Sequence, residues 1–93
     1  MKPASARHRI DITAKALSAE AKRLGVGYEP LGGAVDGLLW LGAITRLVDW
    51  KSPGGALTDS QAKLVARGVP IHFVSDVGQL EALVAAMKRE AMR

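Results

Sequence analysis

VDGLLWLGAITRLVDWK, residues 35–51, consists of two apolar runs joined by Gly42 and Ala43. Two such runs separated by a two-residue loop that begins with glycine predict a β-hairpin, with strands over residues 35–41 and 44–51. Asp49 and Lys51 are two positions apart in the second strand, and alternate residues of a strand point to the same face of a sheet. The sequence therefore predicts that this carboxylate and this ammonium group stand side by side.

Each of the two runs carries an acidic residue among apolar neighbours, Asp36 in the first and Asp49 in the second. Charged side chains are rare in such surroundings unless a partner or a metal ion compensates for their lost hydration. One alternative is that Asp36 is a turn or strand-edge acid. Another is that Asp49 and Lys51 form only an exposed charge pair, worth about 0.2 to 1 kcal/mol. We interpret the three residues as a candidate active site.

The sequence before the hairpin predicts one helix and one strand. Apolar residues recur at intervals of four and three from residue 10 to residue 24, which is the period of one helix face, and Gly25 follows as a helix stop. A first strand is expected over residues 26–29. Pro30 and the pair Gly32-Gly33 then predict a loop that leads into the hairpin.

The sequence after the hairpin predicts a helix, a strand and a second helix. Residues 52–55, SPGG, form a turn signal, and Thr58 can cap a helix that runs to Arg67. A short strand is expected over residues 69–74, where Pro70 favours an edge position or the start of the strand. A last helix, capped by Ser75 or Asp76, is expected to bury one apolar face. That face comprises Val77, Leu80, Val84 and Met87. The element order α-β-β-β-α-β-α predicts an α/β fold around a mixed sheet.

Length and composition limit the classes of protein to consider. The 93 residues suffice for one compact domain, 1–93, and the absence of cysteine excludes disulfides and thiolate metal sites. A net charge of +4 favours an anionic partner such as nucleic acid, although a solvated surface can have the same charge. The longest apolar stretch, residues 34–48, is too short and too interrupted to span a bilayer, so we expect a cytoplasmic protein without membrane contact.

Three motifs follow one another on the predicted elements: VDGLL at residues 35–39, DWK at 49–51 before the SPGG turn, and LTDSQ at 57–61. In this order they resemble the PD-(D/E)XK nuclease superfamily, most closely its virus-type replication-repair nuclease (VRR-NUC) branch. The resemblance extends from Arg9 to about Val84. It implies a restriction-endonuclease-like α-β-β-β-α-β core with a mixed sheet and a C-terminal helix.

The resemblance also implies a chemistry, the metal-dependent hydrolysis of DNA phosphodiester bonds. Asp36, Asp49 and the backbone carbonyl of Trp50 would be the metal ligands, and Lys51 would act as catalytic base or charge stabiliser. These ligands are hard oxygens, a set that favours Mg²⁺ or Mn²⁺, and no organic cofactor is expected. Gln61 would assist catalysis; alternatively, it closes a capping box with the helix cap at Thr58.

The chain departs from the family pattern at three positions. Val35 stands where the family has proline, and Asp49 stands where glutamate is commoner, which the superfamily motif permits. Ala14 stands where the family often places a glutamate or glutamine near the metal. Three alternatives follow from this missing ligand: metal binding is weaker, a water molecule takes the place of the ligand, or Asp11 or Glu20 serves instead.

The resemblance further implies a partner and an assembly. The partner would be branched or duplex DNA, bound by a homodimer in a bacterial or phage-infected host cell. Candidate DNA-binding residues are Arg7, Arg9, Lys15 and Lys63, although charged solvent-facing helix positions look the same. A catalytically silent DNA-binding or regulatory module is the alternative function, and a protein-interaction domain is a third.

Overall fold

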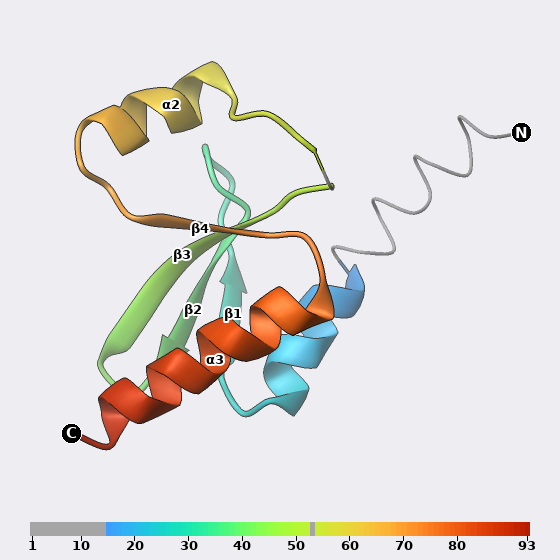
Figure 1. The fold of residues 1–93 in the computed structure, drawn as a ribbon, viewed down its shortest axis with the longest axis vertical. Helices are drawn as coiled ribbons and strands as arrows, with labels where there is room; N and C mark the ends of the chain where they lie inside the picture. Colours follow the sequence, from blue (N-terminus) through green and yellow to red (C-terminus); the bar gives the residue numbers. More distant parts are fainter. Residues whose placement is uncertain (1–14, 53) are drawn as a thin grey trace, which may run out of the picture.

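The computed structural model describes residues 15–52 and 54–93, and it confirms the predicted order of elements. The chain is helical from residue 15 to residue 23, a segment that we call the N-terminal helix. The labelled elements are β1 (Gly27–Pro30), β2 (Gly37–Leu41), β3 (Ile44–Trp50), α2 (Asp59–Ala66), β4 (Ile71–Val74) and α3 (Val77–Ala91) (Figure 1).

The four strands form one mixed sheet in the order β1-β2-β3-β4. β1 pairs with β2 and β2 with β3 in antiparallel fashion, whereas β3 and β4 are parallel. The hairpin of β2 and β3 is closed by the predicted two-residue loop, in which Gly42 has a φ of 62°. A positive φ at the first loop residue is what a type II′ turn requires, and glycine adopts it without strain.

The hydrophobic core lies on one face of the sheet. The N-terminal helix and α3 cover this face (Figure 1), and their buried side chains pack against Leu39, Val48 and Val74. The helices contribute Leu17, Ala21, Leu80, Val84 and Met87. Three of the four residues expected on the buried face of α3 are therefore in the core. Val77, the fourth, is the first residue of α3 and is 41% exposed.

The strand boundaries differ from the predicted ones by one or two residues. Asp36 lies just before β2 rather than inside it, because its backbone N–H bonds to a side chain instead of a neighbouring strand. Lys51 lies just after β3, yet its backbone N–H still donates to the Val74 carbonyl at 2.9 Å. Pro70 precedes β4, which is an edge strand as the proline predicted.

The helix α2 differs from the other helices in that its buried residue is polar. Gln61 is its one buried residue, and Thr58 caps its N-terminus as predicted.

None of the helices in the described part of the chain has the length and the apolar character that a membrane-spanning helix needs.

Candidate active site

Asp49 and Lys51 form a buried ion pair on the sheet face opposite the core. The Lys51 Nζ lies 3.2 Å from Asp49 Oδ2, and the two side chains are only 15% and 8% exposed. The Lys51 Nζ also lies 5.7 Å from the centroid of the Phe73 ring, within the range of a cation–π contact. The predicted side-by-side arrangement is confirmed. The alternative of an exposed charge pair is wrong, because both side chains are largely buried.

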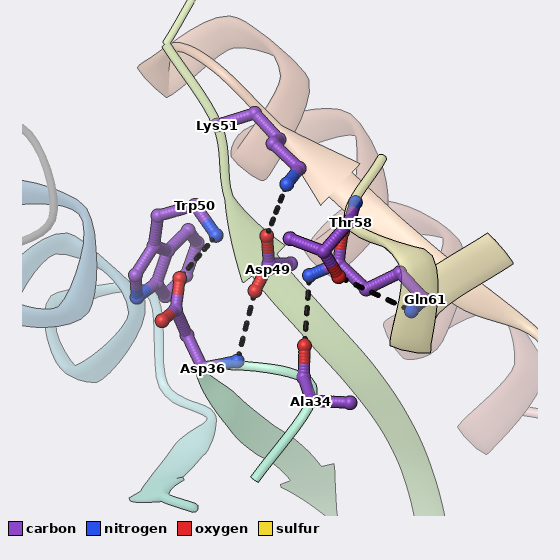
Figure 2. Close-up of polar contacts among 7 residues, drawn as sticks. All are labelled: Ala34, Asp36, Asp49, Trp50, Lys51, Thr58 and Gln61. Atoms are coloured by element: carbon purple, nitrogen blue, oxygen red, sulfur yellow. Dashed lines mark hydrogen bonds and ion pairs between the residues drawn. The ribbon is translucent and has the colours of Figure 1, made fainter. Parts of the chain in front are cut away.

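Asp36 meets Asp49 at the open end of the hairpin, as Figure 2 shows. The last backbone pair of β2 and β3 is Gly37 with Val48, so Asp36 and Asp49 are the next two residues to face each other. The Asp36 backbone N–H donates to Asp49 Oδ1 at 3.0 Å, and the Trp50 backbone N–H donates to Asp36 Oδ2 at 2.8 Å. Each carboxylate thus holds the backbone of the other strand, and these bonds bring the two acids together.

Burial, together with the neighbouring Asp49, raises the pKa of Asp36. Partial burial is the largest cause that raises the pKa of Asp36, and the neighbouring charge of Asp49 raises this pKa further. The Trp50 N–H and the Lys51 ammonium oppose the shift but do not cancel it. In the absence of a cation, the site therefore carries unfavourable negative charge.

Replacing Asp36 by asparagine is expected to raise the free energy of unfolding at pH 7 by about 0.5 kcal/mol, a small value because Asp36 is only partly buried and solvent screens its charge. The raised pKa means that the folded state holds the Asp36 proton more tightly than the unfolded chain. Stability is therefore lost as the pH rises from the ordinary pKa of 3.8 through the raised one. Urea unfolding at pH 7 and pH 4 should show the advantage of the variant shrinking at the lower pH. A variant less stable than the wild type at pH 7 would contradict this account.

Gln61 fastens α2 to the loop that carries Asp36. Its backbone N–H donates to the Thr58 hydroxyl and its Oε1 accepts from the Thr58 N–H, each at 3.2 Å, so the capping box is formed. Its Nε2 donates to the Ala34 carbonyl at 2.8 Å, two residues before Asp36 (Figure 2). Gln61 is 2% exposed and both of its amide atoms are engaged, so the structure confirms the capping-box alternative and adds a bond from α2 to the loop before Asp36. Direct assistance to catalysis by Gln61 stays a prediction.

The other predicted site residues lie apart from this cluster or outside the described residues. Lys15 on the N-terminal helix and Lys63 on α2 are exposed, which leaves phosphate contact open to both. Glu20 forms an ion pair with Arg23 on its own helix, and among the described residues it does not form a metal-binding group with Asp36 and Asp49. Outside the described residues lie Arg7, Arg9, Asp11 and Ala14.

Tyr28 is a site residue that the sequence reasoning missed. Its hydroxyl contacts the Asp36 backbone from β1, the strand next to β2. The sequence carries no signal for this contact, because it depends on which residues of β1 and β2 face each other.

The donors at this site fit a hard divalent cation. Asp36 and Asp49 supply carboxylate oxygens, and the Trp50 carbonyl points to the Asp36 side of β3, because the N–H and C=O of one strand residue point the same way. Among the described residues no third acid or histidine joins them. Mg²⁺ is commonly held in this way, by one or two carboxylates together with water and substrate phosphate. The pair of mutually repelling carboxylates is also a charge arrangement that such a cation neutralises.

Comparisons with known proteins add no further support to this site. No family model, no curated protein and no solved structure gave a significant match to the chain. The similarity to the VRR-NUC family therefore stays a prediction that rests on the motif residues and on their arrangement in the fold.

Proposed function

We propose that the protein is a Mg²⁺- or Mn²⁺-dependent endonuclease that hydrolyses DNA phosphodiester bonds. One observation carries the proposal: the Asp36 N–H donates to the Asp49 carboxylate, the Trp50 N–H donates to the Asp36 carboxylate, and the Lys51 Nζ lies 3.2 Å from Asp49 Oδ2. Two carboxylates and one lysine at the end of a hairpin match the residue types that this hydrolysis needs.

A phosphodiester resists attack because its negative charge repels the nucleophile. A divalent cation bound by Asp36, Asp49 and the Trp50 carbonyl would neutralise this charge and make a water molecule more acidic. The ammonium group of Lys51 has three N–H donors, one of which contacts the Asp49 carboxylate. Its remaining N–H groups can donate to the phosphate oxygen on which charge develops, which stabilises the transition state.

The proposal includes the kind of substrate and the assembly that the VRR-NUC resemblance implies. The substrate is branched or duplex DNA, and the protein acts as a homodimer that presents one site to each of two strands. The net charge of +4 supports a polyanionic substrate, because it attracts DNA at ordinary salt concentrations.

The test is a cleavage assay with labelled four-way junction, flap and linear duplex DNA, each with Mn²⁺, Mg²⁺ or EDTA. We expect cutting with either metal and none with EDTA, and cutting of the junction in preference to the linear duplex. Salt-sensitive DNA binding without cutting would contradict the proposed endonuclease and support the catalytically silent DNA-binding module. If the protein neither binds nor cuts DNA, nucleic acid is excluded as its partner.

A further inference from the structure

A chain of two hydrogen bonds connects the Trp50 indole to the backbone of Asp36 through the Tyr28 hydroxyl. The indole Nε1 lies 3.2 Å from the Tyr28 hydroxyl, which lies 3.3 Å from the Asp36 carbonyl oxygen. The indole N–H can only donate and the carbonyl can only accept. The tyrosine hydroxyl therefore accepts from Trp50 and donates its own proton to Asp36.

These two hydrogen bonds form a second link between Trp50 and Asp36. The backbone N–H of Trp50 donates to the Asp36 carboxylate, while the indole N–H of Trp50 reaches the Asp36 carbonyl through Tyr28. The Asp36 carbonyl also accepts from the Leu31 N–H at 2.8 Å, which closes the loop before β2. Asp36 lies outside the strand ladder, so these contacts replace the ladder bonds that would otherwise fix its backbone.

The packing around Tyr28 favours this arrangement. The rings of Tyr28 and Trp50 are tilted by 43° with centroids 5.6 Å apart, which is a favourable aromatic geometry. The Tyr28 ring lies against Gly37, the residue after Asp36, where an added Cβ would come within 2.3 Å of the ring. A glycine at the start of β2 is thus what lets the ring come close enough to reach Asp36.

We infer that Tyr28 is a positioning residue, whose hydroxyl holds Asp36 in the orientation that binds a divalent cation together with Asp49. The inference rests on the proposed function for the identity of the cation, but the orientation of Asp36 is measurable without it. Residues that orient a metal ligand commonly affect metal affinity by about 10- to 100-fold.

The first experiment compares the Mn²⁺ affinity of the wild type with that of Tyr28→Phe, by calorimetric titration of the full chain. Phenylalanine keeps the ring against Gly37 and Trp50 and removes only the hydroxyl, so we expect the Kd for Mn²⁺ to rise by about tenfold. Asp76→Ala is the matched control, because it removes one hydrogen bond, from the Gln79 N–H, at the start of α3. The control should bind Mn²⁺ like the wild type, and an unchanged affinity in Tyr28→Phe would overturn the inference.

The second experiment separates a failure of this inference from a failure of the proposed function. Hydrogen exchange of the Trp50 backbone amide, which donates to the Asp36 carboxylate, is measured without metal in the same three proteins. We expect this amide to exchange about fivefold faster in Tyr28→Phe than in Asp76→Ala. If the wild type binds no Mn²⁺, the proposed function fails and this exchange alone decides: equal rates in the two variants overturn the role of Tyr28.

Trp50→Phe provides a second variant in case Tyr28→Phe does not fold. It removes the indole N–H at the other end of the same hydrogen-bond chain and keeps an aromatic ring beside Tyr28. Weaker Mn²⁺ binding and faster exchange of the amide of residue 50 would support the inference. Wild-type values of both would overturn it.

Discussion

Replacing Lys51 by methionine is expected to slow DNA cutting by about 100- to 1000-fold, the usual effect of removing one donor that stabilises the charge of a transition state. Methionine retains much of the apolar stem of Lys51 beside Phe73 and removes the ammonium group. The affinity for Mn²⁺ should not fall, because Lys51 binds no metal and its positive charge opposes a cation at Asp49. Single-turnover cutting rates and Mn²⁺ titrations of the same preparation measure the two effects.

Lys63→Met is the matched control for the Lys51 variant. Lys63 is exposed on α2, so its loss removes the same charge from a solvent-facing position. We expect weaker DNA binding with a salt dependence reduced by about one unit of slope, and an unchanged rate in the bound complex. Equal losses of single-turnover rate in the two variants would show that Lys51 contributes only net charge, contrary to our proposal.

Replacing Asp49 by alanine is expected to lower the free energy of unfolding by about 3 to 5 kcal/mol, because it leaves a buried ammonium group without its partner. The Lys51 side chain is 15% exposed, and the Asp36 N–H would also lose its acceptor. The same substitution removes a proposed metal ligand, so Mn²⁺ should no longer stabilise the protein. Urea unfolding with and without Mn²⁺ measures both effects in one experiment.

Two further variants separate the structural role of Asp49 from its role as a ligand. Asp49→Asn keeps an oxygen that can accept from the Asp36 N–H, so we expect a smaller loss of stability but the same loss of Mn²⁺ binding. Asp59→Ala, an exposed acid in the first turn of α2, should bind Mn²⁺ like the wild type. Wild-type Mn²⁺ affinity in Asp49→Asn would exclude Asp49 as a ligand.

Much of the fold could be predicted because the deciding signals are local. The hairpin follows from two apolar runs with Gly42 between them, and the helix α2 follows from the Thr58 cap and its Gln61 partner. The ion pair of Asp49 with Lys51 could be predicted equally well, since the alternation of side chains along a strand is a property of the backbone. The strand boundaries could be predicted less well. Asp36 lies outside β2 because a side chain, and not a neighbouring strand, accepts its N–H.

The sequence by itself determined the order of the elements, the turn of the hairpin and the face shared by Asp49 and Lys51. Only the tertiary structure decided that Gln61 binds the Ala34 carbonyl, that Tyr28 reaches Asp36, and that the hydrophobic core occupies one face of the sheet. The physical reason is that turn chemistry and side-chain periodicity act between near neighbours in the chain. Contacts between β1, β2 and α2 depend on strand register and helix placement, which are set when the whole sheet packs.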